Sequence, residues 1–507
     1  MHNPLGQNTV FMRWLASRDA AFLAASVVIT GTFVFMLLSW TFNPPKDQSV
    51  WGIFQGDMPT YIMNAKATTA RTLFLTYECP YDINEVKPSV MIQLPISLLA
   101  VFLKMGISEV VIVLVIRLVF GSLMFYFIYL IIKTTFKNTY FGTVAFLIIC
   151  LGGGLAWVSP LFNSSGDFWA GIAENEQAYY WWFFNIFRNL MYPFELIYHC
   201  LLFGQIYFLI KNRWKWATLL MVLGLLSNPF LSIHMIAIHL VFLAHDYKKA
   251  PDWRRYYAIL PIALWALYYK AVLPSFPIWN NVMTQHSNAY QSPMTVYDFA
   301  QAYGIAILGL MSLIHKPFRD KCRGKRELLA AFSLIIITLL LVNHTRFPFL
   351  PSLQPLHFSR GYLFFGLWIV LLKWLEVITH ESSVGVQKVV PYLLAVLAIA
   401  TLPDNISFVR DQLRTPPLPK LLSWKQDRQK ILETLRTIPQ TGNVLIGDWD
   451  LNLKIGCMTH HKVLFGTPYT TPDFQERKRD TIRYLINGAK ERNYPTFKKW
   501  RPDRLIK

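Results

Sequence analysis

Long, uninterrupted runs of apolar residues make up most of the chain, and short polar segments separate them. Several runs reach the ~20 residues that an α-helix needs to cross a hydrocarbon core about 30 Å thick. The runs are continuous and do not alternate between apolar and polar positions, which excludes a β-barrel. Because a backbone in lipid must satisfy its own hydrogen bonds, the pattern predicts an all-α polytopic membrane protein.

Eleven transmembrane helices are expected from these runs and from the residues that interrupt them. Their approximate ranges are 20–42, 108–132, 139–158, 194–210, two helices within 216–245, 256–273, 299–315, 327–343, 361–377 and 389–406. The segment 216–245 counts as two short helices because Ser227-Asn228-Pro229 breaks it and both of its flanks are basic. A broken helix at membrane depth is tolerated where protein buries it or where it lines a cavity.

Lysine and arginine residues set the expected orientation. Arg13 and Arg18 precede the first span, and the densest basic cluster lies between Lys316 and Arg326. The positive-inside rule puts both in the cytoplasm, so the N-terminus is expected inside and the C-terminus outside. The first apolar run is too long for a signal peptide and is expected to remain as an anchor. We expect a multi-pass protein of a cell membrane, most simply the bacterial inner membrane.

A long polar region, 43–107, follows the first span and is expected on the outer face. It opens with Asn43-Pro44-Pro45, which stops a helix, and a new helix is expected near Pro59. Residues 89–104 are apolar but short, and they contain polar and proline residues. This composition predicts a helix that lies in the membrane interface.

A second polar region, the tail 408–507, follows the last span. After a proline-rich linker it contains a helix-like segment at 424–437 and strand-like segments at 443–448 and 462–465. These segments predict a small α/β domain on the outer face. We therefore divide the chain into a membrane module, 1–407, and an outer-face domain, 408–507.

The composition agrees with a membrane protein and limits the kinds of partner that are expected. The chain is 54% hydrophobic and only 15% charged, whereas soluble domains carry about 25% charged residues. The net charge of +20 would indicate nucleic acid in a soluble protein, but here basic residues gather in short loops and in the tail. No nucleic-acid-binding motif is present, so membrane lipids are the expected partner and nucleic acid is not.

The five cysteines are scattered and form no metal-type pair. Cys150 and Cys200 lie in apolar spans, where cysteine acts as a small hydrophobe. Cys79 and Cys457 are both expected outside the membrane, and whether they pair is left open. No divalent-metal site is evident from the sequence, and no cofactor is expected.

Two groups of polar residues that could carry chemistry are expected to converge on the outer face. Asp57 lies just before the helix expected at Pro59, and Arg346, His357 and Arg360 lie at the outer ends of the spans 327–343 and 361–377. A carboxylate near cationic residues suits attack on a sugar linked to a lipid phosphate. Asp57 would take the proton of the acceptor hydroxyl, and the arginine and histidine side chains would hold the phosphate.

An aromatic cluster lies in the outer loop before the span 194–210. Its members are Tyr179, Tyr180, Trp181, Trp182, Phe183 and Phe184. Such a cluster could bind the sugar or the isoprenoid chain. The alternative is an aromatic belt at the membrane interface.

The other candidates also have structural alternatives. Asp57 could serve only as a helix N-cap, a position that aspartate favours, and Arg360 could reach along the apolar surface to the interface. Arg117 lies within a span, where a charge is a functional hint. No nucleotide-binding motif is present, and Gly152-Gly153-Gly154 more simply allows close helix packing.

The order of these parts resembles the GT-C fold of membrane glycosyltransferases that use polyprenyl-phosphate-linked sugars. The features that match are the single first span, Gly56-Asp57-Met58-Pro59-Thr60-Tyr61 soon after it, the interfacial helix 89–104 and the outer tail. The resemblance implies that Asp57 is the catalytic base. The acidic pair of some family members is absent because Met58 follows Asp57, and the acceptor motif of oligosaccharyltransferases is missing.

The leading hypothesis is therefore an integral-membrane glycosyltransferase. It would move a sugar from a polyprenyl-phosphate donor to a glycan, lipid or protein acceptor on the outer face. One alternative is an enzyme of the O-antigen ligase or polymerase type, which acts on diphosphate-linked glycans and would depend on Arg346, His357 and Arg360. The other is a lipid or glycan transporter, favoured by the broken segment 216–245 and by Arg117.

Overall fold

The structure is a computed structural model that describes most of the chain. The described residues are 18–44, 48–52, 57–69, 75–82, 88–162, 167–172, 184–247, 253–288, 295–346, 354–414, 423–439, 443–444, 449–467 and 470–487.

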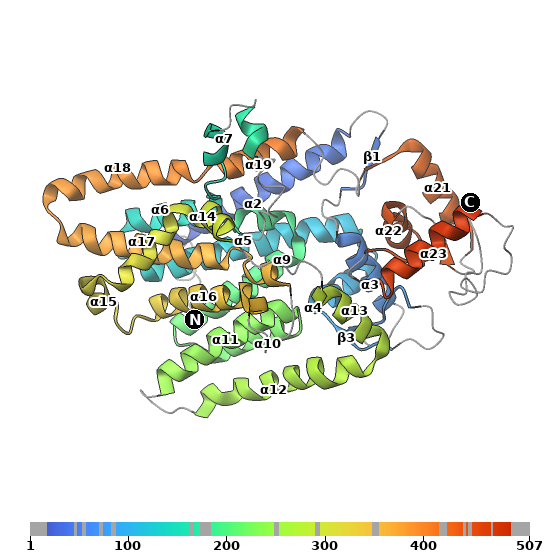
Figure 1. The fold of residues 1–507 in the computed structure, drawn as a ribbon, viewed down its shortest axis with the longest axis horizontal. Helices are drawn as coiled ribbons and strands as arrows, with labels where there is room; N and C mark the ends of the chain where they lie inside the picture. The colour runs from blue at the N-terminus through green and yellow to red at the C-terminus, as the bar shows by residue number, and fades with distance from the viewer. Residues whose placement is uncertain are drawn as a thin grey trace, which may run out of the picture.

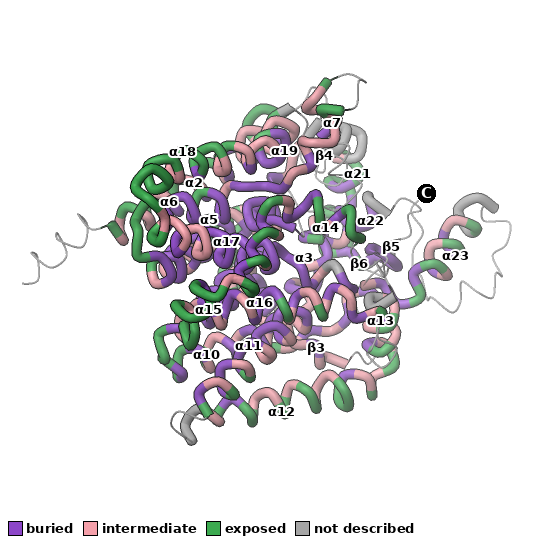
Figure 2. Tube along the Cα trace, turned by 60° about the vertical axis from the view of Figure 1, so that its left-hand side comes forward, coloured by how far each residue is buried: buried purple, intermediate pink, exposed green. Residues whose placement is uncertain are grey.

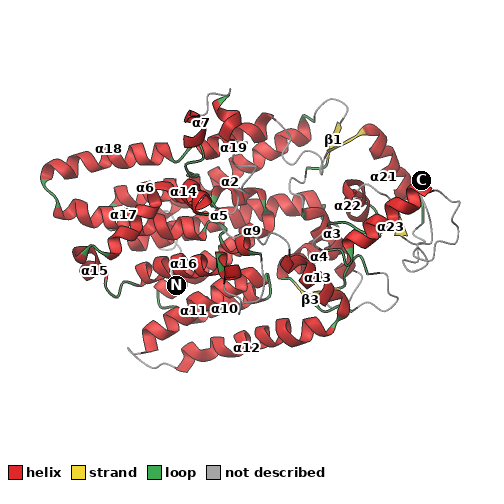
Figure 3. Ribbon diagram, viewed as in Figure 1, coloured by secondary structure: helices red, strands yellow, loops and turns green. Residues whose placement is uncertain are grey.

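Helices dominate the described part of the chain, and the few strands are short (Figure 3). The helices of the bundle are α2 (Arg18–Phe42), α5 (Glu109–Thr135), α6 (Thr139–Leu151), α9 (Pro193–Ile210), α10 (Trp214–Leu225), α11 (Pro229–Tyr247), α12 (Ile259–Leu267), α14 (Val296–Tyr303), η6 (Gly304–Leu313), α15 (Lys316–Cys322), α16 (Arg326–Val342), α17 (Tyr362–Glu381), α18 (Val384–Ala400) and α19 (Pro403–Arg414). The shorter helical elements are α3 (Met58–Thr69), α4 (Leu94–Lys104), α7 (Val158–Phe162), η2 (Phe187–Met191), η3 (Trp253–Ala258), η4 (Tyr268–Val272), η5 (Leu273–Ser275), α13 (Pro277–Asn288), η7 (His344–Arg346), η8 (Pro355–Phe358), α21 (Gln426–Thr437), α22 (Trp449–Met458) and α23 (Phe474–Asn487). The strands are β1 (Gln48–Val50), β2 (Thr76–Tyr77), β3 (Met91–Ile92), β4 (Ser423–Lys425), β5 (Asn443–Val444) and β6 (Lys462–Val463).

The expectation of a multi-pass helical membrane protein is confirmed. In the described part of the chain, 8 helical segments are long and apolar enough to cross a membrane. They are Arg18–Phe42, Glu109–Thr135, Pro193–Ile210, Pro229–Tyr247, Tyr256–Ser275, Val296–Leu313, Tyr362–Glu381 and Val384–Leu413. The other three expected spans contain the shorter helices α6, α10 and α16, of 13, 12 and 17 residues. The total of eleven crossings therefore stays a prediction.

The span expected at 139–158 is shorter than its apolar run. Helix α6 stops at Gly152, whose backbone is extended, so Gly152-Gly153-Gly154 lies in a loop and not in a helix. Glycine suits Gly152 and Gly153 because neighbouring atoms pack closely against their backbone, as expected. A Cβ on Gly152 would lie 2.9 Å from Oγ1 of Thr401, and one on Gly153 would lie 2.6 Å from Cβ of Asp404.

The break at Ser227-Asn228-Pro229 is confirmed as the turn between α10 and α11. The Asn228 side chain accepts hydrogen bonds from the backbone N–H groups of Phe230 and Leu231 at 2.9 and 3.2 Å. It therefore caps α11, and Pro229 occupies the first helical position, which suits its fixed φ. The turn also binds the polar region that follows the first span, because the Leu94 N–H donates to the Leu226 carbonyl at 2.7 Å.

The core lies along the central helices. Helix α5 packs against α2 and α9, and α17 packs against α16, η6 and α6. Most residues of α9 and α17 are buried, whereas α12 and α18 lie at the periphery and expose large apolar side chains (Figure 2). Exposed examples are Leu260, Leu264, Tyr392 and Ile399. An apolar surface of this extent requires a membrane or a partner to cover it.

The polar region after the first span and the C-terminal tail meet at one end of the bundle (Figure 1). Strand β1 pairs antiparallel with β4, with Gln48 opposite Lys425, and α22 packs against α3. Lys66 donates a hydrogen bond to the Cys457 carbonyl. Basic helix α15 lies at the opposite end. The tail thus shares structure with the loop, while the boundary at residue 408 and the side of the membrane that this end faces stay predictions.

A buried aspartate joins the loop after α6 to the start of α19. The Asp404 carboxylate accepts hydrogen bonds from the backbone N–H groups of Gly154, Ala156 and Trp157 at 2.8, 3.1 and 2.9 Å. Arg188 donates to the Asp404 carbonyl at 2.8 Å. Arg188 lies in η2, which leads into α9, so Asp404 helps to fix the loop that precedes this helix.

Replacing Asp404 by alanine should destabilise the protein strongly. Three buried N–H groups would lose their acceptor, and leaving such groups unsatisfied costs about 1–3 kcal/mol each, with partial relief by rearrangement. We expect a fall in the midpoint of thermal unfolding in detergent of several degrees. Asp320→Ala is the matched control, because Asp320 is exposed on α15; equal midpoints for the two variants would contradict the assigned role.

Candidate active site

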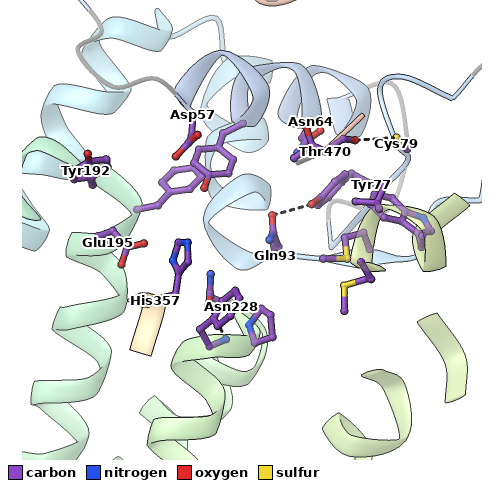
Figure 4. A pocket seen from close by; sticks show the side chains of 18 of the residues that line it. Asp57, Asn64, Tyr77, Cys79, Gln93, Tyr192, Glu195, Asn228, His357 and Thr470 are labelled. Atoms are coloured by element: carbon purple, nitrogen blue, oxygen red, sulfur yellow. Dashed lines mark hydrogen bonds between the residues drawn. The ribbon is translucent and has the colours of Figure 1, made fainter. Parts of the chain in front are cut away.

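A cavity of about 180 Å³ opens at the end of the bundle where the N-terminal polar region and the tail meet. Its lining comes from α3 and the β2–β3 hairpin on one side, and from the starts of α9 and α11, from α13 and from the segment before α17 on the other. Thr470 of the tail completes it. Elements from the beginning, middle and end of the chain therefore build one site (Figure 4).

Asp57 lies at the N-terminus of α3 and borders the cavity. Its carbonyl accepts a hydrogen bond from the Tyr61 N–H at 3.1 Å, so the backbone of Asp57 occupies the position that begins the helix. The residue is exposed, and its side chain lies on the same side of the cavity as Glu195 and His357 (Figure 4). The cap position and a place in the site are therefore compatible.

Two phenol groups near Asp57 remain protonated. Burial raises the pKa of Tyr61 well above its ordinary value, and the charge of Asp57 raises this pKa further. Burial and then the charges of Asp57 and Glu195 likewise raise the pKa of Tyr192. Both hydroxyl groups line the cavity as potential hydrogen-bond donors at neutral pH.

Arg360 is held in the cavity wall by an unusual backbone turn. Its φ is 37° and that of Gly361 is 76°, so two successive residues adopt left-handed conformations, which costs a non-glycine residue roughly 1–2 kcal/mol. The Arg360 carbonyl accepts a hydrogen bond from Nε2 of His199 at 2.8 Å. A Cβ on Gly361 would lie 2.8 Å from the Ile186 side chain, so only glycine fits there. Packing therefore fixes this turn and the direction of the arginine.

The Arg360 guanidinium is 2% exposed and has three kinds of partner. Its Nη1 lies 3.0 Å from Oε2 of Glu195, and its Nη2 donates to Nδ1 of His357 at 3.1 Å. Its Cζ lies 5.5 Å from the ring centre of Tyr198 and 5.8 Å from that of Phe230, within the range of cation–π attraction. Burial among these partners leaves the guanidinium little freedom to move.

The contact with Arg360 fixes the tautomer of His357. A guanidinium group can only donate, so Nδ1 of His357 accepts and the proton of the neutral ring is on Nε2. The ring stacks on Phe230 at a centroid distance of 5.0 Å, which sets its orientation. In this tautomer, Nε2 of His357 is a hydrogen-bond donor.

Glu195 is the site residue that sequence analysis missed. It lies in the first turn of α9, after Tyr192 and Pro193, and a carboxylate is favoured there by the helix dipole. The sequence does hold a signal, because an acidic residue at the start of an apolar span is a functional hint. We call Asp57, Glu195, His357 and Arg360 the polar wall.

The far side of the cavity is apolar and aromatic. Its members, which we call the apolar wall, are Tyr77, Met91, Trp279, Val282 and Met283. The Tyr77 and Trp279 rings meet edge to face at 5.7 Å, and the Tyr77 hydroxyl donates to Gln93 at 2.8 Å. The two walls would offer a ligand a charged end and an aromatic surface.

The remaining predicted residues lie elsewhere. Arg346 is in η7, is exposed and does not line the cavity. Tyr179, Tyr180, Trp181 and Trp182 lie outside the described residues, so the aromatic wall predicted there stays a prediction. Phe184, at the end of that cluster, is buried and packs edge to face on Tyr303.

The structure also shows the surroundings of Arg117 and of the cysteines Cys79 and Cys457. Arg117 is buried in α5 and donates to the Met191 carbonyl at 3.0 Å, so it helps to fix the segment before α9. Cys79 and Cys457 form no disulfide, and Cys79 lines the cavity. Over the part of the chain that the structure describes, no group of three or more His, Cys, Asp or Glu residues is placed to bind a metal ion.

These features define a multi-pass helical membrane protein with an acid–base cavity at one end. No family model matches the chain, and no curated protein matches it. Among solved structures it is similar to the archaeal oligosaccharyltransferase AglB from Archaeoglobus fulgidus in complex with an inhibitory peptide and a dolichol-phosphate, at 12% identity, a TM-score of 0.43 and 89% coverage of this chain. The apo form of the Archaeoglobus fulgidus oligosaccharyltransferase matches at 11% identity, a TM-score of 0.46 and the same coverage. The chain spans 65% and 64% of the length of these two structures, and the similarity concerns the fold alone.

Proposed function

We propose that the protein is an integral-membrane glycosyltransferase that takes a sugar from a polyprenyl-phosphate donor. The observation that carries this proposal is that Asp57, His357 and Arg360 line one cavity although they come from opposite ends of the membrane module. A carboxylate that can accept a proton thus lies in the same cavity wall as donors that can hold an anion. The broad class, a membrane transferase, also agrees with the resemblance to the GT-C layout.

Three members of the polar wall have a part in the proposed reaction. The Asp57 carboxylate takes the proton of the acceptor hydroxyl as its oxygen bonds to the sugar carbon. The bond from that carbon to the phosphate oxygen breaks, and the lipid phosphate leaves with the electron pair. Arg360 and the Nε2–H of His357 stabilise the charge that develops on the phosphate. The acceptor is a glycan, lipid or protein, and the transfer takes place on the outer face.

The direct test uses the full chain in lipid nanodiscs with polyprenyl phosphates that carry radiolabelled glucose, mannose or galactose. A membrane extract supplies acceptors. Label that leaves the lipid and appears in a new covalent product supports the proposal. Label that moves between leaflets of a liposome without covalent change indicates the transporter, and transfer only from diphosphate-linked glycans indicates the ligase or polymerase type.

The apolar wall is proposed to contact the donor's sugar or its first isoprene unit. Trp279 supplies the largest aromatic surface there, so Trp279→Ala should raise KM for the donor about tenfold, as expected for the loss of one aromatic contact worth about 1.5 kcal/mol. The turnover number should change much less, because Trp279 lies away from the polar wall. Steady-state kinetics with varied donor measures both values.

Trp216→Ala is the matched control for Trp279→Ala, because Trp216 is 54% exposed on α10 and lies outside the cavity. Its kinetics should equal those of the parent protein. An unchanged donor KM in Trp279→Ala would remove the apolar wall from donor binding.

A further inference from the structure

Helix α15 and the residues that follow it form a strongly basic surface at the end of the bundle opposite to the cavity (Figure 1). Its exposed cations, which we call the basic patch, are Lys316, Arg319, Arg323 and Lys325. Residues 315–326 contain a single acidic residue, Asp320. The basic patch and Asp320 together therefore carry a net charge of about +3.

The spacing of the cations along α15 directs them outward. Lys316, Arg319 and Arg323 follow one another at intervals of three and four residues, so they lie on one face of the helical turn. The opposite face holds Phe318, which is 2% exposed and packs against side chains of α16 and α17. Phe318 therefore anchors α15 to the bundle, and the charged face is left to the surroundings.

The four cations of the basic patch make no side-chain hydrogen bond or ion pair within the described part of the chain. Two neighbouring basic residues do have partners. Lys321 pairs with Glu381 at 2.6 Å, and Arg326 pairs with Asp246 at 2.6 Å. Unpaired like charges on one surface repel one another and oppose the compact state. An anionic ligand would relieve this repulsion.

An exposed apolar surface adjoins the basic patch. Met311, Leu313 and Ile314, at the end of η6, are 49, 49 and 76% exposed. The chain thus changes from exposed apolar to exposed basic side chains between Ile314 and Lys316. A phospholipid has both matching parts, an anionic headgroup and acyl chains. A nucleic acid or an acidic peptide would cover the charges and leave the apolar side chains uncovered.

We propose that the basic patch is a binding site for anionic phospholipids, whose acyl chains lie along the end of η6. Arginine binds phosphate oxygens through two N–H groups, and lysine binds them as a point charge. Basic clusters close to the ends of membrane helices attract anionic headgroups. The site is separate from the cavity, so it does not depend on the proposed transfer reaction.

The test measures binding of lipid molecules to the full chain in a neutral detergent by native mass spectrometry. The probes are phosphatidylglycerol and phosphatidylcholine of equal chain length, which differ in net charge. The parent protein should prefer phosphatidylglycerol about a hundredfold, because each net charge contributes a factor of about five, or about 1 kcal/mol. A higher concentration of ammonium acetate should reduce this preference, since salt screens exposed charges.

Two triple variants separate the basic patch from the effect of net charge alone. The patch variant is Lys316→Gln, Arg319→Gln and Arg323→Gln, and the tail variant is Lys430→Gln, Lys462→Gln and Arg483→Gln. All six side chains are exposed, and both variants lose the same charge. The patch variant should bind the two lipids about equally, whereas the tail variant should keep the parent preference. Because the patch side chains have no partners in the described chain, the patch variant should unfold at the parent temperature.

Several outcomes would overturn the lipid site. One is a patch variant that keeps the parent preference, and another is a tail variant that loses it to the same extent. Glycerol 3-phosphate carries the phosphate without acyl chains, so the parent protein should bind it more than about tenfold more weakly than phosphatidylglycerol. Equal or tighter binding of glycerol 3-phosphate, or of a short oligonucleotide, would assign the basic patch to a soluble anion. None of these results depends on whether the protein transfers a sugar.

Discussion

Asp57→Asn should reduce sugar transfer about a thousandfold, within the 10²–10⁴-fold range that general-base catalysis contributes. Asparagine keeps the shape of the side chain and remains a good N-cap, so α3 should form normally. The variant loses only the ability to accept a proton. We therefore expect kcat to fall while KM for the donor changes little. Single-turnover rates with saturating donor measure the chemical step directly.

Glu78→Gln provides the matched control for Asp57→Asn. Glu78 belongs to the same polar region after the first span, but it does not line the cavity. The variant should transfer sugar at the parent rate. Full activity of Asp57→Asn would leave Asp57 with its capping role alone and would favour the ligase or polymerase alternative, in which arginine and histidine dominate.

Arg360→Lys should weaken donor use strongly, by about thirtyfold in kcat/KM. Lysine keeps the charge but loses the planar set of donors that binds a phosphate in a forked geometry. Loss of part of a buried, charge-assisted contact costs about 2 kcal/mol or more, which corresponds to such a factor. The loss in kcat/KM should come mainly from a higher KM if Arg360 holds the donor in the ground state. It should come mainly from a lower kcat if Arg360 acts as the phosphate leaves.

Lysine is the better substitution because Arg360→Ala would leave Glu195 buried without a partner, which destabilises proteins by about 3–5 kcal/mol. Arg346→Lys serves as the control, since Arg346 is exposed and lies outside the lining. It should have parent kinetics. If Arg346→Lys is as defective as Arg360→Lys, the phosphate is held outside the cavity and the polar wall is misassigned.

Much of the fold could be predicted because lipid imposes a simple pattern. Apolar runs indicated α2, α5 and α17 closely, and Asn228-Pro229 marked the start of α11. The apolar run 139–158 predicted a helix longer than α6, because hydropathy cannot detect the extended backbone of Gly152. The tail helix at 424–437 was also found from the chain alone, since its boundaries coincide with α21 within a few residues.

The site was harder to predict because it depends on contacts between distant segments. Asp57 could be singled out by its place before α3, and His357 and Arg360 by their place before α17. Glu195 was overlooked because its neighbours made the first turn of α9 look like ordinary membrane span. The left-handed turn at Arg360 and the contribution of α13 arise from tertiary packing, for which no local pattern exists.

The pairing of β1 with β4 and the presence of Thr470 in the cavity lining have a consequence for biosynthesis. The loop that carries Asp57 is synthesised before its partners, because β4 and Thr470 lie several hundred residues further along the chain. A nascent chain therefore has its apolar helices synthesised before the cavity is complete. An unfinished chain lacks Thr470 and therefore has an incomplete cavity lining. The cavity can be completed only after the segment that contains Thr470 has been synthesised.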